Sequence, residues 1–155
     1  MGLQYGVLLR DQIVEISTNI KKMKKVYISQ QPIYIKLFSG IYINHKLNKV
    51  KKRLPKIYRD ELQGISDGSG VPFDDLIFIN VSGNLIKGYC ASILLREKSN
   101  KILHGRNFDL VPHFLSNYFV IVNYNNDIKF TNFGIISYIG SFQGINENGI
   151  AISLN

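Results

Sequence analysis

The sequence predicts an α+β fold, in which a helical first half is followed by antiparallel strands. Up to residue 82, apolar residues recur at spacings of three and four, the period of a helix with one face in a core. After Ser82-Gly83 the pattern changes to short apolar runs separated by polar turns, which is typical of strands. Runs of helices followed by runs of strands indicate α+β layers. Of the 155 residues, 45% are hydrophobic, which is enough for a globular core.

Four helices are expected in the first half. The first spans residues 4–30, because Ile13, Ile16 and Ile20 share one helical face and Pro32 follows its end. The other three are a helix over residues 33–50, a helix that opens at Pro55 and stops at Gly68-Ser69-Gly70, and a helix that opens at Pro72. In the second helix, one face is expected to be buried: Leu37, Phe38, Ile41 and Leu47.

Short strands are expected in the second half, where β-branched and aromatic residues gather between turn residues. A turn is expected at Asn148-Gly149, before the last strand, because glycine accepts the positive φ that such a turn requires. The expected strands are residues 90–95, 101–106, 118–124, 128–131, 135–139 and 150–154.

The net charge of +8 is concentrated before residue 90. Residues 1–89 carry 14 Lys and Arg against 7 Asp and Glu, whereas residues 90–155 carry 5 against 4. A solvated helix face is the first explanation, and attraction to an anionic membrane surface is the alternative. Nucleic acid is not expected as a partner, because the lysines have no aromatic platform and no known nucleic-acid-binding motif beside them.

The sequence lacks the residues that a metal site, a phosphate-binding loop or a signal peptide requires. Three scattered histidines and one cysteine form no metal-ligand cluster, so no metal is expected. No glycine-rich phosphate loop is present, and no other cofactor is indicated. Residues 1–10 have no basic segment followed by a long apolar run, so they do not resemble a signal peptide.

The chemistry-bearing stretch surrounds Cys90, the only cysteine of the chain. Residues 90–95 and 101–106 flank a polar turn, which predicts a hairpin centred near Lys98. The residue opposite Cys90 is then Arg106 or Asn107. A fixed cation beside a thiol favours the thiolate, which is the nucleophilic form. A buried structural cysteine beside a surface arginine is the open alternative, because a free cysteine is often buried.

Three blocks of the sequence carry a family resemblance. The first runs from Cys90-Ala91-Ser92-Ile93 to His104-Gly105-Arg106-Asn107-Phe108-Asp109, the second over residues 144–155, ending in Leu154-Asn155, and the third over residues 61–80. Together they resemble the acid ceramidases and N-acylethanolamine acid amidases. The third also resembles the acyl-coenzyme A:6-aminopenicillanate acyltransferase relatives. These families belong with the choloylglycine (bile-salt) hydrolases and penicillin V acylases among the N-terminal-nucleophile cysteine hydrolases.

The resemblance implies an αββα sandwich, of which this chain would be an incomplete part. It also implies that the precursor cleaves its own Tyr89–Cys90 bond, so that residues 1–89 form a helical α-subunit-like region and residues 90–155 begin the catalytic β-subunit-like region. Cys90 would be the nucleophile, and its new α-amino group the base. The implied roles of the other residues are thiolate stabilisation by Arg106, binding of the α-amino group by Asp109 and an oxyanion contact by the backbone of Asn155.

The implied reaction is hydrolysis of a fatty-acid amide, such as ceramide or an N-acylethanolamine, through a thioester acyl-enzyme. Apolar residues after the second strand, including Phe108 and Leu110, would hold the acyl chain, or belong to the core instead. The resemblance implies a lysosomal or extracellular enzyme, and the sequence itself leaves the compartment unknown.

Two departures from the family pattern bear on this expectation. Ala91 stands where the relatives have threonine, and the relatives continue well beyond the position of Asn155, into a region that supplies another asparagine and arginine. We therefore expect a fragment, a truncated gene model or a shortened paralogue, which needs a missing β-subunit half or forms a homo-oligomer. The alternative functions are an inactive module that binds a lipid or a partner, and an acyltransferase of the same superfamily.

Overall fold

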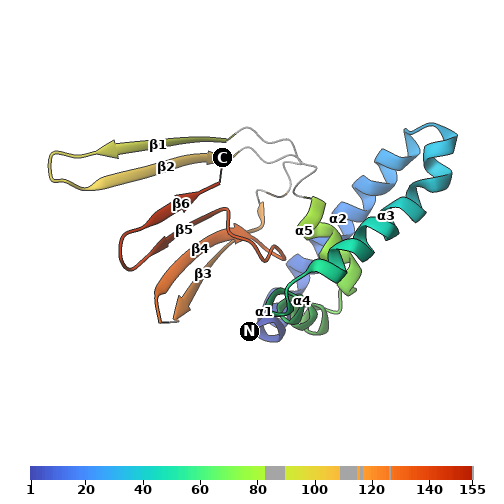
Figure 1. Ribbon diagram of the computed structural model, residues 1–155, viewed down its shortest axis with the longest axis horizontal. Coiled ribbons are helices and arrows are strands. Elements are labelled where there is room, and N and C mark those ends of the chain that lie inside the picture. Colours follow the sequence, from blue (N-terminus) through green and yellow to red (C-terminus); the bar gives the residue numbers. More distant parts are fainter. Residues whose placement is uncertain (83–89, 109–114, 116, 126, 155) are drawn as a thin grey trace. The chain divides into compact units, whose positions relative to one another are not determined.

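The computed structural model describes residues 1–82, 90–108, 115, 117–125 and 127–154, with only the backbone described at Ser82 and Phe108 (Figure 1). The chain divides into two compact units, Met1–Gly83 and Asn84–Asn155. The described elements of the first unit are helices and those of the second are antiparallel strands, which confirms the predicted α+β class. The predicted division between residues 89 and 90 concerns a cleavage site, and it stays a prediction.

Five helices form the described part of the first unit: α1 Gly2–Leu8, α2 Arg10–Ser29, α3 Ile33–Arg53, α4 Lys56–Ser69 and α5 Phe73–Ser82. The prediction of one helix over residues 4–30 is wrong, because the chain leaves helical geometry at Leu9, where φ is −111° and ψ is 24°. The other three helices agree with the prediction. Helix α4 ends at Ser69, and the following Gly70, with a φ of 75°, is the left-handed cap expected of glycine.

Helices α1 and α4 pack through two pairs of glycines, each pair spaced by one helical turn. Gly2 and Gly6 lie on α1, and Gly64 and Gly68 lie on α4. A Cβ atom added to Gly6 would lie 2.6 Å from the carbonyl oxygen of Ile65, and one added to Gly64 would lie 2.7 Å from the backbone nitrogen of Leu3. Small residues at this spacing allow two helix backbones to approach closely. The break at Leu9 therefore frees α1 to lie against α4.

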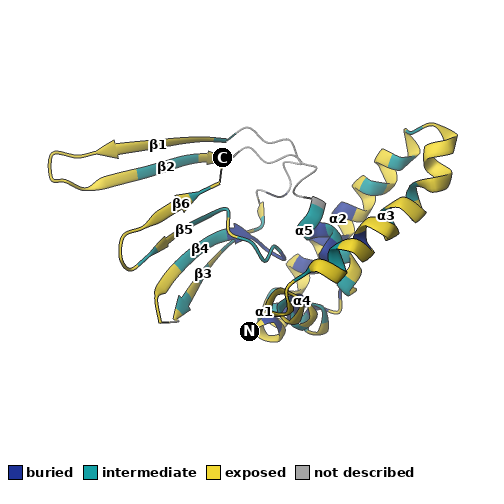
Figure 2. Ribbon diagram, viewed as in Figure 1, coloured by how far each residue is buried: buried dark blue, intermediate teal, exposed yellow. Residues whose placement is uncertain are grey.

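The core of the helical unit is aliphatic, with Ile13, Ile16 and Leu62 wholly buried. The predicted buried face of α3 is largely wrong: Leu47 is buried, but Leu37, Phe38 and Ile41 are 73%, 60% and 69% exposed (Figure 2). The remaining buried apolar residues of this unit are Ile20, Ile65, Val71, Leu76, Ile77 and Ile79. None of the described helices is long and apolar enough to cross a membrane.

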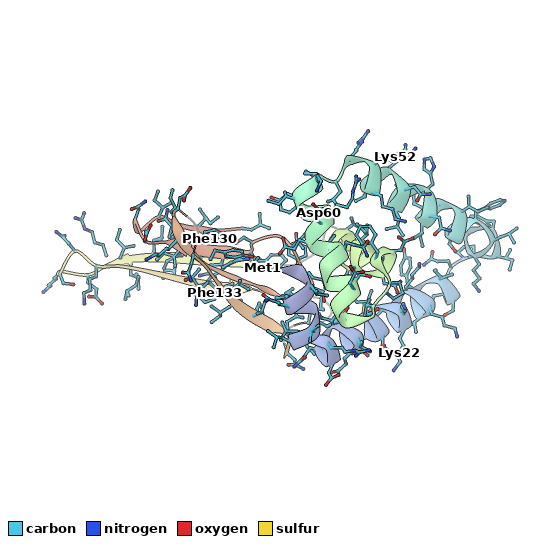
Figure 3. All side chains as sticks on the ribbon, turned by 90° about the horizontal axis from the view of Figure 1, so that it is seen from below. Met1, Lys22, Lys52, Asp60, Phe130 and Phe133 are labelled. Atoms are coloured by element: carbon cyan, nitrogen blue, oxygen red, sulfur yellow. The ribbon has the colours of Figure 1, made fainter. Side chains whose placement is uncertain are left out.

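Two lysine-rich stretches, residues 21–25 and 49–53, are partly engaged inside the helical unit. Lys21 pairs with Asp75 at 2.6 Å, Lys51 pairs with Asp74, and Lys24 lies 4.9 Å from the centre of the Phe78 ring. Exposed ion pairs of this kind contribute little to stability. Other lysines of the same clusters point into solvent, as Lys22 on α2 and Lys52 on α3 do in Figure 3. The solvated-face interpretation therefore accounts for part of the basic charge.

Replacing Glu61 by glutamine should stabilise the helical unit at neutral pH. Burial raises the pKa of the Glu61 carboxyl above its ordinary value of 4.5, and the amino group of Met1 lowers it by a smaller amount. A carboxyl with a raised folded-state pKa loses stability as pH rises through and above 4.5. We expect the melting temperature of Glu61→Gln to exceed that of the unchanged chain by a few degrees at pH 7, with the difference shrinking below pH 4.5. A difference that is constant over this pH range would contradict the assignment.

Six strands form two sheets in the described part of the second unit. A two-stranded sheet pairs β1 Cys90–Arg96 with β2 Ile102–Phe108. A four-stranded antiparallel sheet has the order β3 Phe119–Asn125, β4 Lys129–Ile135, β5 Gln143–Asn146 and β6 Ala151–Ser153. Phe130 of β4 stacks on Tyr124 of β3, with ring centres 4.3 Å apart, and Phe133 of β4 lies on the opposite face (Figure 3).

Two strand predictions differ from the structure. The expected strand over residues 135–139 is wrong, because β4 already ends at Ile135 and Ser137 takes a positive φ of 72° in the following turn. Strand β5 was not expected, since Gly144 and the polar residues around it weaken the strand pattern. Gly149 has a φ of 77° before β6, as predicted for that turn.

Candidate functional site

The hairpin of β1 and β2 places the chain's thiol next to a cation. Its turn is one residue later than predicted, because Asn100 takes a positive φ of 64° and closes a three-residue loop. Cys90 therefore pairs with the backbone of Phe108, and Arg106 pairs with Ser92. The predicted partner of Cys90, Arg106 or Asn107, is thus wrong. Arg106 nevertheless lies on the same face as Cys90, because a shift of two residues preserves the face.

Arg106 reaches the thiol and two carbonyl oxygens at once. One terminal nitrogen, Nη2, lies 3.4 Å from Sγ of Cys90, and it also donates to the carbonyl oxygen of Leu154. The other, Nη1, donates to the carbonyl oxygen of Phe142 over 2.6 Å. Both Cys90 and Arg106 are half-buried. The two carbonyl contacts hold the guanidinium in place, so it presents a fixed positive charge to the sulfur.

Backbone contacts arrange the two carbonyl groups that Arg106 binds. Leu154 follows β6, and Phe142 precedes β5. The N–H of Leu154 donates to the carbonyl oxygen of Phe142 over 2.9 Å, which joins the two segments. The four-stranded sheet therefore supplies acceptors to a cation that comes from the hairpin.

A chain of three polar side chains lies beside this contact. The Ser92 and Ser153 hydroxyl oxygens are 3.2 Å apart, and the Ser153 oxygen is 3.2 Å from Nε2 of His104. Ser92, His104 and Arg106 share one face of the hairpin, because the register pairs Ser92 with Arg106 and Leu94 with His104. This face lies next to β6 (Figure 1).

Several residues singled out from the sequence fall outside the described structure. They are Tyr89, Asp109, Leu110 and Asn155, together with the side chain of Phe108. The structure brings Cys90 and Arg106 together, and the roles of all these residues stay predictions. Sequence reasoning missed the carbonyl groups of Phe142 and Leu154, because a backbone acceptor has no residue-type signal. It also missed Ser153, although the alternation along residues 151–153 places Ser153 and Ala151 on one face.

This arrangement suits nucleophilic chemistry at sulfur. Cys90 is a free thiol, and it is the first residue of its strand. A guanidinium within contact distance stabilises a negative charge on sulfur, and a thiolate attacks carbonyl carbon far more readily than a thiol does. Among the described residues, no group of three metal-ligating side chains is close enough to hold a metal ion.

Comparison with known proteins gives a family match over the second half of the chain. The model of the acyl-coenzyme A:6-aminopenicillanic acid acyl-transferase family matches residues 95–155, a span that contains Arg106 and the strands from β2 to β6. Cys90 lies just before the matched span. The match thus covers the hairpin's second strand and the sheet that supplies its carbonyl contacts.

Individual relatives extend the match to more of the chain. Acid ceramidase of Mus musculus is 26% identical over 129 residues, covering 73% of this chain and 32% of the relative. N-acylethanolamine-hydrolyzing acid amidase of Mus musculus is 28% identical over 112 residues, covering 69% and 30%. Protein dcd1B of Dictyostelium discoideum is 24% identical over 169 residues, covering 95% and 34%. The chain spans about a third of the length of these relatives.

By these matches, the chain is similar to a class of amide-cleaving enzymes and acyltransferases. Within this class, the chain is similar to acid ceramidase and N-acylethanolamine-hydrolyzing acid amidase.

Proposed function

We propose that this chain carries the nucleophilic part of an amidohydrolase that cleaves a fatty-acid amide, such as ceramide or an N-acylethanolamine. The observation that supports it best is the 3.4 Å contact between Nη2 of Arg106 and Sγ of Cys90. The names of the relatives point to the same bond type, since one is a ceramidase and another hydrolyses N-acylethanolamines. The proposed fold of the whole enzyme is an αββα sandwich.

The proposed first reaction is self-cleavage between Tyr89 and Cys90. The Cys90 thiolate attacks the Tyr89 carbonyl carbon, the C–N bond breaks as its nitrogen takes up the proton that the thiol lost, and a thioester joins the two residues. Water then hydrolyses this thioester, which leaves a carboxylate on Tyr89 and a free α-amine on Cys90. A free α-amine has a pKa of about 7.7–8.0, so a neutral fraction is available to take a proton from the thiol.

Substrate turnover would use the same sulfur. The thiolate attacks the amide carbonyl carbon, the leaving amine takes up a proton, and the fatty acyl group remains on sulfur as a thioester. Water then attacks the thioester, releases the fatty acid and restores the thiol. Arg106 would stabilise the thiolate, Asp109 would bind the α-amino group, and the backbone N–H of Asn155 would donate to the oxyanion. The proposed acyl-chain contacts are Phe108 and Leu110.

The proposed partners follow from the substrate and from the charge. A fatty-acid amide resides in a lipid surface, and the exposed lysines of α2 and α3, such as Lys22 and Lys52, would attract anionic headgroups. The apolar side chains that the hairpin exposes, including Ile93, Leu94 and Ile102, offer a surface that a protein partner would cover. We propose the further β-subunit-like region of the family, or a second copy of this chain, for that role.

A covalent acyl-enzyme on Cys90 is the expected product when the chain meets an activated fatty-acid amide. The chain is incubated with a fatty-acyl anilide, quenched in acid and measured by intact mass. We expect the fragment or chain that contains Cys90 to gain the mass of the acyl group, and hydroxylamine to remove it, because thioesters are labile to this amine. A second amine added before the quench distinguishes the two reactions, because acyl transfer gives a new amide and hydrolysis gives the free fatty acid.

The Cys90→Ala variant is the control for this experiment. It should gain no acyl mass under the same conditions. An adduct that persists in this variant, or no adduct on the unchanged chain at acidic and neutral pH, would contradict the proposed function. The second result would favour an inactive module that binds a lipid or a partner.

A further inference from the structure

In the described part of the chain, the hairpin and the four-stranded sheet are two separate sheets. Near the thiol, side chains of the hairpin connect the two sheets. Arg106 makes one connection, through the carbonyl groups of Phe142 and Leu154. The polar chain from Ser92 through Ser153 to His104 makes another. Ser153 is the residue immediately before Leu154, so the two connections meet at the end of β6.

From this geometry we propose that Ser153 and His104 are positioning residues for the thiol. Their hydrogen bond fixes β6 against the face of the hairpin. The Leu154 carbonyl group is thereby held where Arg106 can contact both this carbonyl group and Cys90. Neither residue touches the substrate in this proposal, and neither transfers its proton. The inference rests on the function proposed above, and it adds two residues to which that function gives no role.

The hydrogen-bonding capacity of the three side chains allows this link to persist. A serine hydroxyl donates one hydrogen bond and accepts two, and Nε2 of neutral histidine either donates or accepts, depending on the tautomer. If Nε2 accepts, Ser153 donates to His104 and Ser92 donates to Ser153. If Nε2 donates, the chain runs in the opposite direction. Both arrangements satisfy Ser153, so the link does not depend on one tautomer.

The spacing along β2 explains why the position of β6 matters to Arg106. His104 and Arg106 are two residues apart on one strand, and their side chains lie on one face. Their two contact points, Ser153 at the end of β6 and the carbonyl group of Leu154 just after it, belong to consecutive residues. Without the first contact, β6 can move relative to the hairpin, and Arg106 would follow its two carbonyl partners away from the sulfur.

The test is the rate at which iodoacetamide alkylates Cys90, measured by intact mass separately for the uncut chain and for the fragment 90–155. The chain has one cysteine, so a single label reports on Cys90 alone. We expect Ser153→Ala and His104→Leu each to lower the second-order rate constant about threefold to tenfold at pH 7, the effect of losing about one hydrogen bond. Ser153→Thr and His104→Gln, which retain a hydrogen-bonding group, should restore the rate to within about twofold.

Two further variants make the result decisive. Ser99→Ala removes a serine contact to Glu97 in the hairpin turn, away from Cys90, and should leave the rate unchanged. Arg106→Leu should lower the rate at least as much as Ser153→Ala does. Unfolding would expose the thiol but would also remove it from Arg106, so the rates are compared only among variants whose circular dichroism and melting temperature match those of the unchanged chain.

The outcomes separate this proposal from the proposed function. Unchanged or faster alkylation in both Ser153→Ala and His104→Leu, with slower alkylation in Arg106→Leu, would overturn the positioning role and leave the function standing. A rate that stays as slow in Ser153→Thr and His104→Gln as in the first two variants would also overturn it. An unchanged rate in Arg106→Leu would contradict the role of Arg106, and with it both proposals.

Discussion

The Cys90→Ala variant is expected to remain a single species of 17.7 kDa, whereas the unchanged chain divides between Tyr89 and Cys90. The loss should be complete, because alanine has no nucleophile and self-cleavage begins with attack by the residue-90 side chain. Intact mass of the purified chain measures both outcomes directly. The expected fragments are residues 1–89 and 90–155.

Incubation at acidic and at neutral pH completes this experiment. Cleavage of the unchanged chain at another bond, or equal cleavage of Cys90→Ala, would show that a contaminating protease is responsible. An uncut chain at both pH values would contradict self-processing, even though the Cys90–Arg106 contact is in place.

The second large effect concerns the helical unit. Gly64→Ala should lower its free energy of unfolding by about 1–3 kcal/mol, because the added methyl group would meet the backbone of α1. The nearest atom, the backbone nitrogen of Leu3, would lie only 2.7 Å from the new Cβ, and a backbone cannot turn aside as a flexible side chain can. Urea denaturation followed by helical circular dichroism measures the change.

Gly40→Ala is the matched control for Gly64→Ala. Gly40 also lies inside a helix, α3, but an added Cβ there would have no neighbour within 4 Å. Alanine forms helix better than glycine by about 1 kcal/mol, so this variant should be more stable than the unchanged chain. Equal effects of the two substitutions would show that α1 and α4 are not closely packed.

The hairpin at Cys90 could be predicted because its signals are local. Strand-forming residues flank a polar turn, and only the length of the turn is left open by this pattern. The length of the turn depends on Asn100, which adopts a positive φ. A positive φ is uncommon for residues other than glycine, although asparagine adopts it more often than most. The partner of Cys90 is Phe108, which is two positions from the predicted Arg106. Arg106 still lies on the same face of the hairpin as the thiol.

The partners of Arg106 on the sheet could not be predicted in the same way. The carbonyl groups of Phe142 and Leu154 are 36 and 48 residues away in sequence, and any residue type offers such an acceptor. Their positions depend on how the end of β6 meets the segment before β5. The resemblance indicates that residues 144–155 matter, but it does not indicate which atoms face Arg106.

The glycines of the helical unit show a different limit. Taken singly, Gly64 and Gly68 indicate breaks in structure, because glycine is a poor helix former. Their one-turn spacing, matched by Gly2 and Gly6, is instead a signal of close helix packing. A single glycine does not reveal this, whereas two pairs at the same spacing do.

The start of β1 at Cys90 has a consequence for the chain after cleavage. The proposed scissile bond precedes the first described strand and follows the last described helix, α5, which ends at Ser82. Cutting it would leave each described helix and strand whole, and would end the covalent connection between the described helices and the described strands. Any association between them would change from an intramolecular event to one governed by mass action, so that dilution would oppose it. The same cut that creates the nucleophile would thereby make assembly of the enzyme depend on protein concentration.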